Sequence, residues 1–314
     1  MPTLLDRQLL VITGKGGVGK TTLAAALGLL AARRGRRTIV AEVGQESHLP
    51  ALFGRPTAAE GVELALADGL SSITIDPDRA LLEWLQVLGG RVSGRVLASS
   101  GTFQYFAAAA PGARELVTMV KLWRLTGAGG RGGGARRGGY DLVILDAPAT
   151  GHALGMLSSP HTFGAIARVG PIASQTRQLQ ELLETPARSA YLAVALATEM
   201  AVTEALELED GLRARLGRGL AAVLVNALLP RRFDAAELRR IDGLRTGAGA
   251  AVASAAAAAH AIHDRARFQH NQLARLRRRD FEVLGVPFVW SRELDLDAIA
   301  GIAARLERRL YPAG

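Results

Sequence analysis

A glycine-rich segment near the start of the chain has the residue types and spacing of a phosphate-binding loop. Residues 14–22 read GKGGVGKTT and match the pattern G-x-x-x-x-G-K-[ST]. Glycines let successive backbone N–H groups approach phosphate oxygens that side chains would block. The segment therefore predicts a binding site for a magnesium nucleoside triphosphate, formed by Gly14, Lys15, Gly16, Gly17, Val18, Gly19, Lys20, Thr21 and Thr22.

Three side chains are the candidates for chemistry at this site. Lys20 supplies a positive charge to the β- and γ-phosphates, and the Thr21 hydroxyl is a ligand for Mg²⁺. Residues 140–146 read YDLVILD, an apolar run that ends in the carboxylate of Asp146. A carboxylate at the end of such a strand holds the magnesium ion beside the threonine. We expect Lys20 and Asp146 to be catalytic, with Thr21 and Asp146 as the Mg²⁺ ligands.

Lysine is rare in this chain, which gives weight to the lysines of the loop. The chain has 38 basic residues, but only Lys15, Lys20 and Lys121 are lysines. Arginine presents a wide planar fork, whereas an ammonium group is a compact point charge that fits a tight phosphate cradle. The two lysines in the loop therefore indicate a chemical requirement, and Lys15 joins the predicted catalytic residues.

The elements around the loop follow the pattern of an α/β protein with a doubly wound, mainly parallel sheet. Residues 21–34 favour a helix that ends at Gly35. Short apolar runs alternate with helical patterns and predict strands at residues 8–13, 38–43, 71–75, 140–145, 191–196, 220–225 and 282–289. We expect one domain over residues 1–314, with a helical subdomain formed by inserts at about 77–125 and 154–189.

Composition and charge narrow the classes of protein. Of the 314 residues, 49% are hydrophobic and 21% are charged, the balance of a soluble globular protein. The net charge of +9 and the arginines at the end of a long predicted helix over residues 248–279 do not by themselves indicate a specific nucleic-acid partner. The chain has no cysteine and no apolar stretch of membrane-spanning length. We expect a cytoplasmic protein that is not an integral membrane protein and has no thiolate zinc site.

Three motifs together resemble one family. Lys15 stands at the place of the early lysine of deviant P-loop ATPases, the class related to MinD and ParA. Residues 146–152 read DAPATGH, and residues 225–230 read VNALLP. Both segments are similar to those of the arsenite-pump (ArsA) and tail-anchored-protein targeting ATPases, and the chain resembles a bacterial, single-domain member of that family. The resemblance implies a P-loop NTPase fold and a Mg²⁺-dependent ATPase in which Asn226 binds the adenine.

The resemblance also implies a working unit larger than one chain. Lys15 would reach across a dimer to the partner's nucleotide, and ATP would close the dimer and rearrange the helical inserts. A homodimer is the leading expectation, and a hydrophobic client or a membrane-protein partner is possible. We interpret the segment that contains His152 as a relay from the γ-phosphate to the inserts rather than as a source of a catalytic histidine.

The chain departs from the family at the position of the water-positioning aspartate. Aligned through Leu49 and Phe53, that position is Gly44, with Glu42 and Glu46 two residues to either side. Removing such a base typically lowers the rate by about 10² to 10⁴. A slow ATPase, a nucleotide-binding switch, the non-catalytic half of a heterodimer with a paralogue, and a ParA-like positioning protein therefore stay open as alternatives. Without cysteine, the chain also lacks the ligands for zinc and for arsenite.

Overall fold

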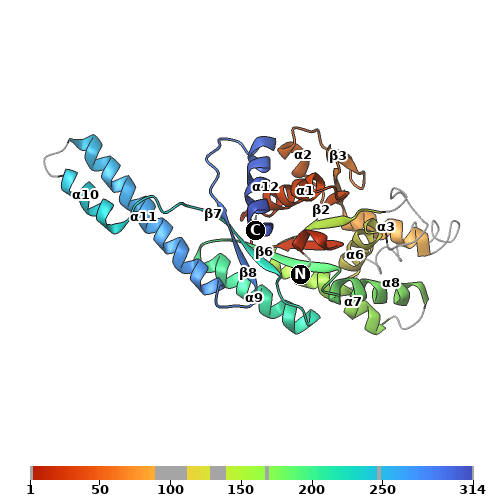
Figure 1. The fold of residues 1–314 in the computed structure, drawn as a ribbon. Helices are drawn as coiled ribbons and strands as arrows, with labels where there is room; N and C mark the ends of the chain where they lie inside the picture. The colour runs from red at the N-terminus through yellow and green to blue at the C-terminus, as the bar shows by residue number, and fades with distance from the viewer. Residues whose placement is uncertain (1–2, 89–111, 128–138, 167–169, 246–248, 313–314) are drawn as a thin grey trace.

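The computed structural model describes residues 3–88, 112–127, 139–166, 170–245 and 249–312 and has an eight-stranded sheet at its centre (Figure 1). The strand order is β3-β4-β2-β5-β1-β6-β7-β8, and every neighbouring pair is parallel except β3 and β4. The strands are β1 (Leu9–Thr13), β2 (Thr38–Val43), β3 (Leu64–Ala67), β4 (Leu70–Ile75), β5 (Leu142–Asp146), β6 (Ser189–Leu196), β7 (Ala222–Leu228) and β8 (Glu282–Pro287). The predicted α/β fold with a mainly parallel sheet is confirmed.

The central strands consist almost entirely of apolar residues because both of their faces are covered. All five residues of β1 are buried, and β1 lies between β5 and β6 in the sheet. One face packs against α1 (Lys20–Arg33), α2 (Leu49–Leu52) and α12 (Leu296–Leu310). The other face packs against α3 (Pro77–Leu88), α6 (Ala113–Leu125), α7 (Thr150–Ile166), α8 (Gly170–Glu184) and α9 (Glu199–Leu216) (Figure 1).

The helices predicted as inserts share the core of the sheet in their described parts. Trp84 of α3 and Met119 and Trp123 of α6 are buried in the same cluster as residues of β2 and β5. Residues 89–111 and 167–169, which belong to the two inserts, lie outside the described residues. The described apolar faces therefore pack on the core, and a separate helical subdomain stays a prediction.

One strand was not predicted from the sequence. Strand β3 pairs antiparallel with β4 through a tight turn at Gly69, whose φ is +71°. A strand this short at the edge of a sheet has no periodicity of its own, and its pairing with β4 defines it. The predicted strand over residues 282–289 ends earlier, at Pro287.

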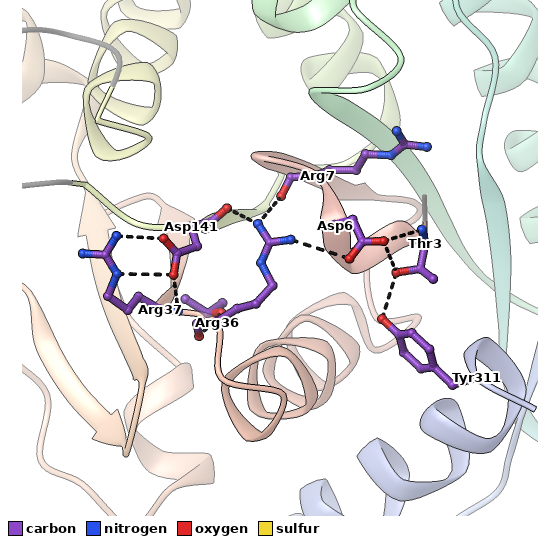
Figure 2. Close-up of polar contacts among 8 residues, drawn as sticks. Thr3, Asp6, Arg7, Arg36, Arg37, Asp141 and Tyr311 are labelled. Carbon is purple, nitrogen blue, oxygen red and sulfur yellow. Dashed lines mark hydrogen bonds and ion pairs between the residues drawn. The ribbon is translucent and has the colours of Figure 1, made fainter. Parts of the chain in front are cut away.

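A polar network joins both ends of the chain at the amino-terminal edge of the sheet (Figure 2). Arg36 donates to the carbonyls of Arg7 and Asp141 and lies 3.9 Å from a carboxylate oxygen of Asp6. Arg37 binds the Asp141 carboxylate through its backbone N–H, at 2.9 Å, and its guanidinium, at 2.7 Å. These contacts hold the starts of β2 and β5 and the segment before β1 together. The glycine-rich loop, which follows β1, lies at the opposite edge of the sheet.

A pair of helices stands away from the body of the protein. The chain leaves the sheet after β7, forms α10 (Ala235–Arg245), and returns through the 27-residue α11 (Ala250–Leu276) to the start of β8 (Figure 1). The inner part of α11 contributes Leu273 and Leu276 to the core, whereas Ala256 and Ala259 lie in the outer part. We call α10 and residues 250–262 of α11 the arm. None of the described helices combines the length and the apolar composition that a membrane-spanning helix needs.

Candidate functional site

The glycine-rich loop lies between β1 and α1, where the carboxyl ends of the parallel strands meet. Gly14 has a φ of +148°, and a Cβ atom there would collide with the Val194 carbonyl of β6. Gly19 has a φ of +93°, and a Cβ atom there would collide with the Asn226 side chain. Both glycines are needed because the loop turns in the left-handed region directly against neighbouring strands.

Lys20 begins α1 and lies across the inside of the loop. Its Nζ donates to the carbonyls of Gly14 and Lys15, at 3.2 Å each. Partial burial lowers the pKa of Lys20, and the nearby charge of Asp146 acts in the opposite direction. These two carbonyls thus hold the Lys20 ammonium inside the glycine-rich loop.

Thr21 and Asp146 come together beside Lys20. The Thr21 hydroxyl donates to Asp146 Oδ2 at 2.5 Å, and the Asp146 side chain is only 8% exposed. Burial raises the pKa of Asp146 to about 6; the hydrogen bond from Thr21 acts against this rise, and the charge of Glu42 adds to it. Ionisation of the Asp146 carboxyl therefore costs free energy in the folded protein, as is common at functional sites.

The Thr21–Asp146 pair fits a magnesium ion. Asp146 Oδ1 is buried and has no hydrogen-bond partner among the described residues. Mg²⁺ prefers oxygen ligands, keeps several waters, and is bound by one or two carboxylates together with substrate phosphates. No group of three or more His, Asp or Glu side chains is placed to hold a metal within the described part of the chain. The remaining ligands would then be phosphate oxygens and water.

Lys15 points away from its own loop and toward α9. Its Nζ lies 3.1 Å from Glu204 Oε1 and also contacts Met200 Sδ. The Lys15 side chain is 37% exposed and lines a cavity of about 380 Å³ together with Thr150 and Leu154. Lys15 and Lys20 therefore have different surroundings although both belong to one loop.

Asn226 contacts the loop from the end of β7. Its Nδ2 donates to the Val18 carbonyl at 2.9 Å, and its Oδ1 accepts from the Ala227 N–H at 2.8 Å. Ala227 has a φ of +56°, a backbone conformation that residues other than glycine rarely adopt. The structure thus shows Asn226 bracing the loop, and its contact with adenine stays a prediction.

The two glutamates near Gly44 have separate environments. Glu42 is buried at the end of β2 and accepts hydrogen bonds from Ser47 Oγ at 2.5 Å and from the backbone N–H groups of His48 and Leu49 at 2.9 and 3.3 Å. Glu46 is exposed beside a cavity of about 330 Å³. The Glu42 carboxylate is therefore occupied in holding the loop that follows β2, a role that the sequence analysis did not identify.

The segment after Asp146 is anchored to β1. Thr13 donates to the Pro148 carbonyl at 2.9 Å, and α7 begins at Thr150. Thr150 Oγ1 is buried and has no partner among the described residues, whereas His152 is exposed in the first turn of α7. Thr150 is thus a candidate phosphate contact that the sequence analysis did not single out. Its place in the DAPATGH segment is the signal that points to it.

Comparisons with known proteins agree with this geometry. The profile of the family described as anion-transporting ATPase matches residues 7–185. The chain is 28% identical to the ATPase BagA of Mycobacterium tuberculosis over 240 residues, which cover 74% of this chain and 68% of that protein. It is 26% identical to a putative arsenical pump-driving ATPase of Halobacterium salinarum (72% of this chain, 36% of that protein). It is also 27% identical to the ATPase GET3 of Paracoccidioides lutzii (56% of this chain, 50% of that protein). The chain belongs to the anion-transporting ATPase family.

Proposed function

We propose that the protein binds and hydrolyses ATP with Mg²⁺ and works as a dimeric switch whose nucleotide state acts on a client or partner protein. The observation that carries the proposal is the arrangement of Lys20, Thr21 and Asp146 around the glycine loop, with a buried carboxylate oxygen that has no partner among the described residues. A buried charge without a partner is costly unless a ligand completes it. The arrangement is therefore best explained as a site for a magnesium nucleotide.

Each residue of the site has a distinct part in this proposal. The backbone N–H groups of residues 14–22 and the Lys20 ammonium bind the phosphates and stabilise the charge that develops during transfer. Thr21 and Asp146 would hold Mg²⁺, which would neutralise negative charge on the phosphates. Thr150, at the start of α7, lines the cavity that Lys15 and Gly16 of the loop also line. A contact from Thr150 to the γ-phosphate would link the nucleotide state to α7 and the helices packed on it.

Lys15 supports the dimeric part of the proposal. Its ammonium lies against α9, outside the cradle formed by its own loop. A partner subunit that faces this edge would offer its nucleotide to Lys15. The client or partner would then respond through α3, α6, α7 and α8.

A second candidate function rests on Gly44. The site has no carboxylate at this position, and Glu42 is already hydrogen-bonded to Ser47 and two backbone N–H groups. A chain that holds ATP but hydrolyses it slowly, alone or beside a catalytically complete paralogue in a heterodimer, fits this feature. A ParA-like positioning protein is the further alternative, and salt-dependent DNA binding would reveal it.

Three single lysine variants test the proposal, because the chain has only three lysines. Lys20→Ala should abolish ATP binding measured by titration calorimetry. Lys15→Ala should keep monomer binding but lose ATP-dependent dimerisation and hydrolysis. Lys121→Ala is the control, since Lys121 pairs with Glu83 at 2.9 Å and is not part of the loop. Equal loss of binding in the Lys15 and Lys20 variants would contradict the division of roles.

A further inference from the structure

Strand β7 is irregular at the end that reaches the glycine-rich loop. Its register against β8 shifts between Val225 and Leu228, where β7 has one residue more than its neighbour. An extra residue of this kind forms a β-bulge, which bends its strand and turns a side chain out of the regular alternation. The bulge contains Asn226 and Ala227, and the φ of Ala227 is +56°. The irregular part of β7 therefore coincides with the residue that contacts the loop.

The bulge places the Asn226 side chain directly against the loop. The amide of Asn226 donates to the Val18 carbonyl and accepts from the Ala227 N–H, so it joins the loop to the bulge. There is no free space between Asn226 and Gly19, because a Cβ atom at Gly19 would collide with Asn226 Nδ2. A shift of Asn226 would therefore displace the backbone of the loop. The conformation of the bulge thus bears on the shape of the phosphate-binding cradle.

A glutamine of α11 holds the backbone of the bulge. Inward from the arm, α11 packs against β7, and Gln269 is buried there, with only 8% of its surface exposed. Its Oε1 accepts from the Leu229 N–H at 2.8 Å, and its Nε2 donates to the Ala227 carbonyl at 3.2 Å. A side-chain amide offers an acceptor and a donor, as a peptide unit does. Gln269 thus binds the irregular backbone of β7 as a neighbouring strand binds a regular one.

The conformation of Ala227 depends on these side-chain contacts. A residue with a side chain pays a free-energy cost at positive φ, and such a conformation persists only where the surroundings determine it. The Ala227 N–H donates to Asn226, and the Ala227 carbonyl accepts from Gln269. Removal of the Gln269 amide would take a partner from two backbone groups of the bulge. Ala227 could then relax to a commoner conformation, and Asn226 would turn away from the loop.

We propose that Gln269 is a positioning residue of the nucleotide site. Its amide fixes the bulge of β7, the bulge orients Asn226, and Asn226 holds the glycine-rich loop in the form that binds phosphate. The inference rests on the proposed binding of ATP by this loop. It adds to the site a residue of α11, outside the motifs at residues 14–22, 146–152 and 225–230. The affinity for ATP then depends on Gln269, which acts through Asn226 and not by touching the nucleotide.

Two variants of Gln269 and one matched control test the proposal. Gln269→Leu and Gln269→Met each remove both hydrogen bonds and keep a side chain of similar size. The control is Gln272→Leu, because Gln272 lies on the same helix, is also 8% exposed, and accepts from Arg275 at 3.0 Å. Titration calorimetry with Mg-ATP measures the affinity, and thermal melts without nucleotide show which variants are folded.

The expected result is that both Gln269 variants bind Mg-ATP at least fivefold more weakly than the wild type, whereas Gln272→Leu changes the affinity by less than twofold. Unchanged affinity in either folded variant of Gln269 would overturn the positioning role and leave the proposed function intact. An equal loss in Gln272→Leu would trace the effect to the packing of α11 and would overturn it as well. A wild type that does not bind Mg-ATP would overturn the proposed function and this inference together.

Two combined variants separate positioning from a merely structural role. Glycine adopts a positive φ without strain, so Gln269→Leu with Ala227→Gly should bind Mg-ATP at least threefold more tightly than Gln269→Leu alone. In a protein that already carries Asn226→Ala, Gln269→Leu should cause no further loss, because its effect passes through Asn226. No recovery with Ala227→Gly, or losses that multiply in the Asn226→Ala background, would show that Gln269 does not act through the bulge and would overturn the inference.

Discussion

Among the single residues of the site, Asp146 is a carboxylate whose ionisation costs free energy in the folded protein. Asp146 is buried, and this burial raises its pKa to about 6. A carboxylic acid with a raised pKa destabilises the fold as pH rises from about 4 to 6, because the folded state resists its ionisation. At neutral pH the penalty is on the order of 1–3 kcal/mol. Binding of Mg-ATP would offset this penalty.

We therefore predict that Asp146→Asn stabilises the nucleotide-free protein and abolishes its response to Mg-ATP. The melting temperature at pH 7.5 should rise above that of the wild type, and the difference should shrink as the pH falls and disappear near pH 3, below the ordinary pKa of the carboxyl. Thermal melts at both pH values, with and without Mg-ATP, measure this. Asp297→Asn, an exposed carboxylate, is the control and should change neither. A less stable Asp146→Asn protein at pH 7.5 would contradict the prediction.

The contact of Lys15 with Glu204 leads to a second prediction. Their atoms lie 3.1 Å apart within one subunit, so this pair competes with any contact that Lys15 makes across a dimer. Glu204→Gln removes the competing charge and should tighten Mg-ATP-dependent dimerisation by about twofold to tenfold, as measured by sedimentation. Glu181→Gln, which removes a similar pair with Arg188 at 3.2 Å and does not touch Lys15, is the control. Weaker association of Glu204→Gln would mean that Glu204 positions Lys15 rather than restraining it.

The third prediction concerns Gly44. Its φ is +145°, and an added Cβ would meet no atom within 4 Å. Any side chain there pays a backbone strain of about 1–3 kcal/mol, although there is space for it. Gly44→Asp should therefore melt at a lower temperature than the wild type, together with Gly44→Ala.

Comparison of the two variants isolates the carboxylate from the strain. If hydrolysis is limited by a missing base, Gly44→Asp should turn over ATP at least tenfold faster than Gly44→Ala. Equal rates in the two variants would show that the carboxylate is not what limits the reaction. In that case, loss of turnover in Glu46→Gln would identify the exposed Glu46 as the substitute base.

At the scale of elements, α7 connects the nucleotide site to the other inserted helices. It begins at Thr150 beside the loop and packs against α6 and α8. We predict that exchange of ADP for a non-hydrolysable ATP analogue changes amide hydrogen exchange in α7 and α8, because a γ-phosphate contact restrains the start of α7. Exchange-mass spectrometry measures it, with α12 as the internal reference. Unchanged protection in both helices would leave only a packing role for them.

At the scale of the whole molecule, the network at the amino-terminal edge joins segments from both ends of the chain (Figure 2). The hydrogen bond from the Arg37 side chain is the main cause of the lowered pKa of Asp141. A lowered carboxylate pKa contributes stability above its usual range and loses it as pH falls through the lowered value. The Asp141 side chain is 39% exposed, so solvent screens the interaction.

We predict that Asp141→Asn lowers the free energy of unfolding by less than about 1 kcal/mol at pH 7. The difference from the wild type should be smaller at pH 2.5 than at pH 7, because the stabilising charge is lost as the pH falls through the lowered pKa of Asp141. Urea denaturation at the two pH values measures this. A difference that is as large at pH 2.5 as at pH 7 would show that the Asp141 charge is not the cause.

Features that depend on neighbouring residues in the chain could be predicted from the sequence. The glycine loop, the strand that ends in Asp146, and seven of the eight strands within three residues follow from local pattern, because backbone conformation and burial periodicity are local properties. The family follows from the same contiguous motifs. The edge strand β3 was not predicted, because four residues are too few to show a periodic pattern of hydrophobicity.

Contacts between residues that are distant in the chain could not be predicted and follow from the fold. The Glu42 carboxylate accepts hydrogen bonds from Ser47 and two backbone N–H groups, so it is not available as a base. Lys15 forms an ion pair with Glu204, which lies 189 positions further along the chain. No periodicity encodes these contacts, since they depend on how the helices pack on the sheet. The same is true of α11: its alanines predict a helix, but the packing of its outer half against α10, away from the core, is visible only once the fold has formed.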